Sequence, residues 1–250
     1  MSKVISVTLQ KGGVGKSTTS QALGSILGSK GNKVLLIDMD SQGNLSYSCG
    51  IVRAERTIYE VISNQCDITD AIQKNKYYDV ISADISLTNA TLELKPSDNL
   101  VLKTKIDMIK GDYDFIIIDT PPSLGVLSIN SLMASDYLVI PTEPSSYSLQ
   151  GISELHDTVK AVQGSNKDLK ILGILLIKYN NRTVLNRQIK EMIQEFADRM
   201  NIKLFDTTIS ESITVRESQA MQEDLIDYAP KSRPALDYID LVNEIIKELK

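Results

Sequence analysis

Residues 10–18 read Gln-Lys-Gly-Gly-Val-Gly-Lys-Ser-Thr and lie between an apolar run and a helical pattern. The apolar run Val4–Leu9 predicts a buried strand, and the pattern from Lys16 to about Lys30 predicts a helix. In a strand, glycine-rich loop and helix of this kind, the backbone N–H groups of the loop can point at a phosphate, and the helix N-terminus adds positive potential. The stretch therefore predicts a phosphate-binding loop.

The side chains of this loop have different expected roles. The ammonium group of Lys16 would lie on the β- and γ-phosphates of a nucleotide, and the hydroxyl of Ser17 would take one position on Mg²⁺. Lys11 cannot easily join Lys16 on the same phosphate because their like charges would crowd, so we expect Lys11 to act across a dimer. The expected nucleotide contacts in the loop are Lys11, Gly12, Gly13, Val14, Gly15, Lys16, Ser17 and Thr18.

Carboxylates follow two other apolar runs. Lys33–Asp38 predicts a buried strand, and Asp40 follows it closely. Tyr113–Asp119 predicts a second buried strand that ends in a carboxylate. Because open α/β sheets bind ligands at the carboxyl ends of their strands, Asp38 and Asp119 are candidate magnesium ligands, and Asp40 is a candidate for positioning an attacking water. Asp38 or Asp40 could instead simply cap a turn.

Strands and helices alternate along the whole sequence. Further strands are expected at 78–83, 137–142, 171–177 and 202–207, and further helices at 57–76, 97–110, 149–162, 184–200, 214–221 and 234–249. This alternation predicts an α/β fold with a doubly wound, mainly parallel sheet and helices on both faces. There is no evident linker, internal repeat or low-complexity segment, so residues 1–250 are expected to form one domain.

Composition and charge restrict the possible functions. The net charge of −5 indicates that the molecule as a whole is not a polyanion binder, so any nucleic-acid contact would need a local patch, doubled by dimerisation. No apolar run approaches the roughly 18 residues of a membrane span. The N-terminus runs directly into the first expected strand, which predicts no signal peptide. We therefore expect a cytoplasmic protein.

Three segments together resemble the motifs of one protein family. Residues 11–18 carry Lys-Gly-Gly-Val-Gly-Lys-Ser-Thr, with Gln10 where an ordinary Walker A motif has its first glycine. Residues 38–44 read Asp-Met-Asp-Ser-Gln-Gly-Asn, and residues 118–123 read Ile-Asp-Thr-Pro-Pro-Ser. In this order and spacing they resemble the deviant Walker A P-loop ATPases of the ParA/MinD group, over essentially the whole chain. The resemblance implies ATP and Mg²⁺ as cofactors, weak intrinsic ATPase activity, and catalytic roles for Lys11, Lys16 and Asp40.

Within this group, the chain resembles the small ParA/Soj-type partitioning ATPases that have no N-terminal helix-turn-helix domain. The resemblance implies a homodimer that forms with ATP, sandwiches two ATP molecules and binds double-stranded DNA without sequence preference. A ParB-like centromere-binding partner would stimulate its slow hydrolysis. Such a protein would be cytoplasmic, associated with the nucleoid when ATP is bound, and not bound to a membrane.

The resemblance also implies roles for two further sets of residues. Arg182, in Asn-Asn-Arg-Thr, matches an arginine that contacts DNA in the family, and Arg216, in Thr-Val-Arg-Glu, matches a second. The run Ile209–Ile213 departs from the family's Ile-Pro-Arg-Asn pattern, and both arginines could instead form solvated surface ion pairs. Lys178, Arg187 and Lys190 could enlarge the DNA patch, and Tyr179 and Asn180 are candidate adenine contacts.

Other functions of proteins with these motifs depend on particular residues. A MinD-like membrane-cycling ATPase remains the main alternative, but the helix expected at Pro234–Leu249 has a mixed, acidic polar face, which favours docking on the core over a membrane surface. An electron carrier with an iron–sulfur cluster would need cysteines at positions other than Cys49 and Cys66. A tyrosine kinase of this class would usually end in a tyrosine cluster, and a passive DNA-binding module would not need the intact loop.

Overall fold

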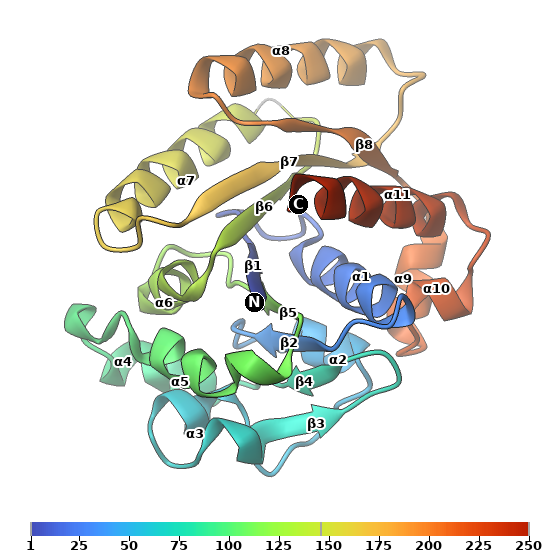
Figure 1. The fold of residues 1–250 in the computed structure, drawn as a ribbon. Helices are drawn as coiled ribbons and strands as arrows, with labels where there is room; N and C mark the ends of the chain where they lie inside the picture. The colour runs from blue at the N-terminus through green and yellow to red at the C-terminus, as the bar shows by residue number, and fades with distance from the viewer. Residues whose placement is uncertain (1, 146, 250) are drawn as a thin grey trace.

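One sheet of eight strands forms the centre of the molecule (Figure 1). The computed structural model describes residues 2–145 and 147–249. The strand order is β3-β4-β2-β5-β1-β6-β7-β8, and every neighbouring pair is parallel except β3 with β4, which confirms the predicted fold class. The strands are β1 (Lys3–Val7), β2 (Val34–Asp38), β3 (Ile72–Lys74), β4 (Asp79–Ile81), β5 (Phe115–Asp119), β6 (Tyr137–Thr142), β7 (Lys170–Tyr179) and β8 (Leu204–Ser210).

Helices cover both faces of this sheet. In Figure 1, α1 and α11 lie on one side and α5, α6 and α7 lie on the other. Short 3₁₀ turns occur at Ile68–Ala71, Pro96–Asp98 and Lys110–Asp112. The helices are α1 (Lys16–Ser29), α2 (Asn44–Ser48), α3 (Ile58–Ile62), α4 (Leu87–Glu93), α5 (Val101–Ile109), α6 (Val126–Ala134), α7 (Ser148–Gln163), α8 (Val184–Met200), α9 (Ile213–Ala220), α10 (Leu225–Tyr228) and α11 (Arg233–Glu248).

Side chains of the central strands face the two helical layers alternately. In β2, Leu36 packs in a cluster with residues of α1 and α11, whereas Leu35 and Ile37 pack with residues of α3 and α5. A third cluster joins β6 and β7 to α7 and α8. Because both faces are covered, consecutive positions of a strand are apolar. This burial explains why the central strands can be recognised in the sequence as unbroken apolar runs.

The expected helical region 57–76 contains only the short helix α3 (Ile58–Ile62) and the 3₁₀ turn Ile68–Ala71, and it is wrong beyond Ala71. Ile72–Lys74 forms the edge strand β3, which pairs antiparallel with β4 so that Ile72 lies opposite Ile81 and Lys74 opposite Asp79. The ammonium of Lys74 also lies 2.7 Å from the carboxylate of Asp79. Pairing with a strand that follows in the chain therefore overrides the local helical pattern.

Some helix boundaries also differ from those expected. The helix predicted for 97–110 begins only at Val101, after the 3₁₀ turn at Pro96–Asp98. The helices α2, α4, α6 and α10 have no counterpart among the expected elements. By contrast, α8 spans Val184–Met200, as expected from its periodicity.

The C-terminal helix α11 packs on the core, as its acidic polar face predicted. Tyr238, Leu241 and Val242 are buried against α1 and the sheet, whereas Leu236, which the helical pattern grouped with the apolar positions, is 44% exposed. The hydroxyl of Tyr238 lies 3.2 Å from the hydroxyl of Thr19, in α1. In the part of the chain that the structure describes, no helix combines the length and apolar character needed to cross a membrane.

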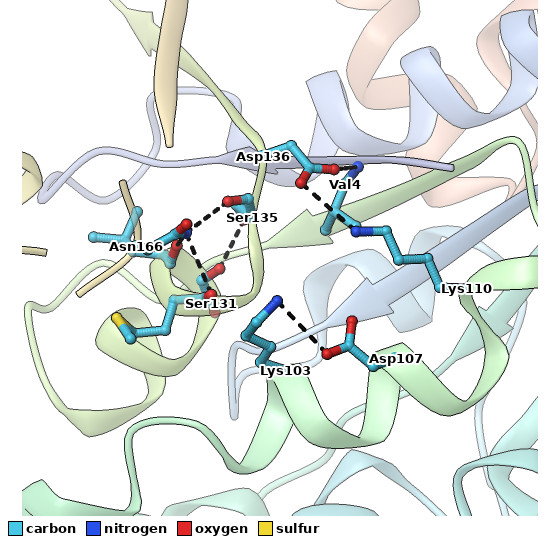
Figure 2. A network of polar contacts seen from close by, with 10 residues as sticks. Val4, Lys103, Asp107, Lys110, Ser131, Ser135, Asp136 and Asn166 are labelled. Atoms are coloured by element: carbon cyan, nitrogen blue, oxygen red, sulfur yellow. Dashed lines mark hydrogen bonds and ion pairs between the residues drawn. The ribbon is translucent and has the colours of Figure 1, made fainter. Parts of the chain in front are cut away.

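A network of polar contacts connects the amino-terminal ends of the central strands with neighbouring segments (Figure 2). The carboxylate of Asp136 accepts a 2.9 Å hydrogen bond from the backbone N–H of Val4 and lies 3.6 Å from the ammonium of Lys110. The amide of Asn166 donates to backbone carbonyls at the end of α6, including that of Ser135 at 2.8 Å. These contacts hold β1 beside β6, and they therefore help to set the position of the glycine-rich loop at the opposite end of β1.

Candidate functional site

The glycine-rich loop follows β1 and leads directly into α1, as predicted. Gly13 and Gly15 have φ values of +75° and +69°, a left-handed conformation in which a side chain would be strained. At Gly15, an added Cβ would also lie 2.7 Å from the Cδ1 atom of Ile177. The backbone conformation therefore favours glycine at position 15, and a side chain there would also have to displace the end of the Ile177 side chain.

Lys16 is the buried cation of the loop. Only 7% of the residue is exposed, and its ammonium donates a 2.9 Å hydrogen bond to the backbone carbonyl of Lys11. Burial lowers the pKa of Lys16, because removal from water disfavours its charged form, while the nearby carboxylates of Asp119 and Asp40 act in the opposite direction. The structure thus brings this lysine to the two carboxylates identified in the sequence.

Asp38 and Asp119 end neighbouring parallel strands and lie opposite each other in the register of β2 and β5. Both residues are completely buried. The Oδ2 atom of Asp119 has no hydrogen-bond partner in the described part of the chain, and its other oxygen accepts a weak 3.4 Å hydrogen bond from Ser20. Burial, with the nearby Asp38 charge, raises the pKa of Asp119 well above its usual value. An unpartnered buried carboxylate oxygen suits a cation, so the site fits the predicted magnesium ion.

The other acidic side chains of the site are more fully bonded. Asp38 accepts hydrogen bonds from the backbone N–H of Asp40 at 3.0 Å and from the N–H and hydroxyl of Ser46 at 2.9 and 2.7 Å. Burial nevertheless raises the pKa of Asp38 to about 6. Asp40 accepts from the N–H of Gln42 at 3.0 Å and lines the cavity beside the loop. Asp38 therefore also shapes the turn that carries Asp40.

A cavity of about 520 Å³ opens beside the loop. Among the described residues, no group of three His, Cys, Asp or Glu side chains has the arrangement of a metal site. A magnesium ion here would therefore take much of its coordination from phosphates and water, as this ion commonly does. The cavity is lined by Gly12, Gly13, Gly15, Lys16, Ser17, Thr18, Asp40, Gln42, Asn44, Tyr47, Ser48, Pro122, Lys178, Val215, Arg216 and Gln219.

A second hollow of about 180 Å³ adjoins the first, and its walls are partly apolar and partly polar, with Thr18, Glu211 and Arg216 among the polar residues. Its walls include Ile177, Ile209 and Tyr238, which come from β7, β8 and α11. These residues are far apart in the chain and carry no local signal in the sequence. A partly apolar hollow with polar groups beside a phosphate-binding loop suits a nucleobase.

Tyr179 and Asn180, the predicted adenine contacts, are not among the residues that line these two cavities. The ring of Tyr179 packs against the cluster beneath α7 and α8, with the ammonium of Lys190 5.6 Å from its centre. Their role in adenine binding stays a prediction without support from this geometry.

The residues expected to bind DNA occupy two places. Arg182 and Arg187 are exposed at the start of α8, where the guanidinium of Arg187 donates a 3.1 Å hydrogen bond to the carbonyl of Asn181. Lys178 and Arg216, by contrast, line the cavities beside the loop. The ammonium of Lys178 contacts the carbonyl of Gly13 rather than projecting with the arginines. The structure therefore does not group all five basic residues into one separate patch.

Comparison with known proteins identifies the family. A family model described as an AAA domain matches residues 2–171. Over 252 residues, the chain is 41% identical to the sporulation initiation inhibitor protein Soj of Bacillus subtilis, covering 98% of both chains. The chain belongs to the ParA/Soj family of P-loop ATPases. It is also 35% identical to the chromosome partitioning protein ParA of Caulobacter vibrioides, covering 98% of this chain and 94% of that protein.

Solved structures share the fold of this ParA/Soj-family chain. Cobyrinic acid a,c-diamide synthase of Mycobacterium smegmatis, with bound ADP and magnesium, matches with a TM-score of 0.86 and 29% identity over 100% of this chain and 96% of that one. The cell division ATPase MinD of Pyrococcus furiosus matches with a TM-score of 0.83 and 26% identity over 99% of both chains. A putative plasmid partition protein of Borrelia burgdorferi bound to AMPPNP matches with a TM-score of 0.82 and 28% identity, covering 100% of this chain and 98% of that one.

Proposed function

We propose that this chain is a partitioning ATPase that dimerises with ATP, binds DNA without sequence preference and hydrolyses ATP slowly. A ParB-like partner would stimulate hydrolysis, and the ATP-bound form would associate with the nucleoid. The observation that carries the proposal is the pair of loop lysines: Lys16 is buried beside Asp119 and Asp40, whereas Lys11 is only half-buried. One lysine can therefore serve the bound nucleotide and the other a second protomer.

The chain's own residues can perform the proposed reaction. Lys16 and the backbone N–H groups of the loop would bind the β- and γ-phosphates and stabilise the charge that spreads over the transferred group. Ser17 and Asp119 would hold Mg²⁺, which would supply further charge neutralisation when bound. Asp40 lies at the cavity wall, where its carboxylate could orient the attacking water.

The most direct test is the size of the protein in solution. Light scattering with ADP, with ATP, and with ATP plus a duplex of arbitrary sequence should give a monomer, a dimer and a DNA-bound dimer, respectively. A dimer in ADP, or a monomer in saturating ATP, would contradict the proposed switch. DNA binding that is independent of ATP would contradict the proposed link between dimerisation and DNA.

Lys11→Ala is expected to bind ATP but remain monomeric. The ammonium of Lys11 lies 3.2 Å from Ser145 rather than in the position of Lys16, so its loss should leave the phosphate contacts of its own protomer in place. Fluorescence titration with an ATP analogue would measure affinity, and light scattering would measure dimerisation. If Lys11→Ala dimerises like the wild type, the proposed role across the dimer is wrong.

Arg182→Ala is expected to weaken binding to duplexes of any sequence and to reduce its salt dependence. Arg182 and Arg216 of two protomers would give about four phosphate contacts, so log K should fall against log salt with a slope of roughly −3 to −4. Fluorescence anisotropy at several salt concentrations measures this slope. Because Arg216 lines the nucleotide cavities, its replacement needs an ATP-binding control. Full DNA affinity in an Arg182→Ala, Arg216→Ala variant that still dimerises would place the DNA surface elsewhere.

The membrane-cycling alternative predicts a different partner. The apolar face of α11 is buried against α1 and the sheet, so this helix offers no free apolar face to a lipid surface. Co-sedimentation with anionic vesicles, with and without ATP, separates the two functions. ATP-dependent pelleting with vesicles, together with no DNA binding, would favour the alternative.

A further inference from the structure

The loop between β6 and α7 holds the glycine-rich loop through Lys178. The ammonium of Lys178 forms an ion pair with the carboxylate of Glu143 and donates a 3.1 Å hydrogen bond to the backbone carbonyl of Gly13. Glu143 directly follows β6, and Lys178 lies near the end of β7. The lysine therefore joins two strand ends to the middle of the phosphate-binding loop.

Serine hydroxyls extend this connection to the other lysine of the loop. The ammonium of Lys11 donates to the hydroxyl of Ser145 at 3.2 Å, and that hydroxyl lies 3.0 Å from the hydroxyl of Ser148. The Ser148 hydroxyl in turn donates to the backbone carbonyl of Glu143. This series of polar contacts thus connects Lys11 with Gly13, and both of these residues belong to the glycine-rich loop.

The backbone of Lys178 is unusual in a way that fits this contact. Its φ is +50°, in the left-handed region that side-chain-bearing residues seldom adopt. Strained backbone persists where the surroundings enforce it, and such positions often serve a function. Lys178, which has this unusual backbone conformation, is the residue that contacts both Glu143 and Gly13.

Holding the carbonyl of Gly13 also orients the next N–H group. The Gly13 carbonyl and the Val14 N–H belong to one planar trans peptide, so they point in opposite directions. Fixing the carbonyl on Lys178 therefore fixes the direction of the Val14 N–H. The N–H groups of this loop are the expected phosphate donors, and donors oriented before binding need no rearrangement when the phosphate arrives.

We propose that Lys178 is a positioning residue for nucleotide binding: its ion pair with Glu143 holds the peptide between Gly13 and Val14 in the phosphate-binding orientation. This inference rests on the proposed function and gives Lys178 a role other than DNA contact. If the loop adopts the binding-competent orientation in only a fraction of the molecules, the nucleotide affinity is reduced in proportion to that fraction. Because the ion pair is partly exposed, with 48% of the Lys178 and 29% of the Glu143 side chain accessible, we expect a moderate effect.

The test is a double-mutant cycle on binding of a fluorescent ADP analogue with Mg²⁺, which does not require dimerisation. Lys178→Met and Glu143→Gln should each weaken binding by about 3- to 10-fold. The double variant should bind no more weakly than the weaker single variant, because the same contact is lost. Lys167→Met is the matched control, since this exposed lysine lies outside both cavities and has no proposed binding role, and it should bind like the wild type.

The Glu143→Gln variant distinguishes positioning from simple attraction of phosphate by a free cation. If Lys178 acted only through its charge, removal of the neighbouring carboxylate would strengthen nucleotide binding, and that result would overturn the proposal. Unchanged affinity in Lys178→Met would overturn it too. Hydrogen exchange of the nucleotide-free protein gives a second readout: both variants should exchange the Val14 N–H faster than the wild type does, whereas equal rates would contradict the proposal. Failure of the wild type to bind Mg-ADP would instead contradict the proposed function.

Discussion

Lys16→Ala is expected to bind ATP at least about 100-fold more weakly than the wild type, because charge-assisted hydrogen bonds to phosphate are lost from a buried position. The variant also leaves Asp119 and Asp40 without the neighbouring positive charge that the structure places beside them. Isothermal titration with a non-hydrolysable ATP analogue and Mg²⁺ measures the loss.

Lys167→Ala is the matched control for Lys16→Ala, because Lys167 is an exposed lysine outside the cavity. The control should bind the analogue like the wild type. Thermal unfolding without nucleotide would separate misfolding from a loss of contacts. A folded Lys16→Ala protein with unchanged ATP affinity would refute the assignment of the phosphate-binding lysine.

Asp40→Ala is expected to form ATP-bound dimers that persist, with hydrolysis slowed by about 100- to 10,000-fold, the usual contribution of a group that moves or orients a proton in the reaction. Asp40 lines the cavity but is not one of the proposed Mg²⁺ ligands, Ser17 and Asp119, so ATP binding should survive. Phosphate release measures hydrolysis, and light scattering after removal of free ATP measures the lifetime of the dimer.

Asp40→Asn refines this experiment. Its side-chain oxygen can still accept the hydrogen bond from the N–H of Gln42, so the turn should be retained while the negative charge is removed. Slow hydrolysis in both variants would point to the charge of Asp40. Hydrolysis at the wild-type rate in Asp40→Asn, together with slow hydrolysis in Asp40→Ala, would show that Asp40 acts only by shaping the turn.

The parts of the site that could be predicted have local signals in the sequence. Glycines at 13 and 15 adopt backbone conformations that suit glycine, and Asp38 and Asp119 each end an unbroken apolar run. These features depend on neighbours in the chain. Their meeting at one sheet edge follows from the parallel arrangement of β1, β2 and β5.

The parts that could not be predicted depend on distant segments. β3 pairs with β4, which follows it in the chain, and the second hollow collects Ile177, Ile209 and Tyr238 from three separate elements. Lys178 was grouped with the arginines because it is near Arg182 in sequence, yet its left-handed backbone and its contact with Gly13 place its ammonium on the loop. The short distance in sequence between Lys178 and Arg182 does not indicate that the Lys178 side chain points toward the loop.

The docking of α11 on α1 has a consequence for synthesis of the protein on the ribosome. Thr19 and Tyr238, whose hydroxyls lie 3.2 Å apart, are separated by 219 positions. The helix that begins at the phosphate-binding loop therefore cannot acquire this neighbour until the chain has been translated beyond Tyr238. Contacts between such distant segments form late and slowly. Chains that are translated only part of the way to Tyr238 should consequently lack a finished ATP site.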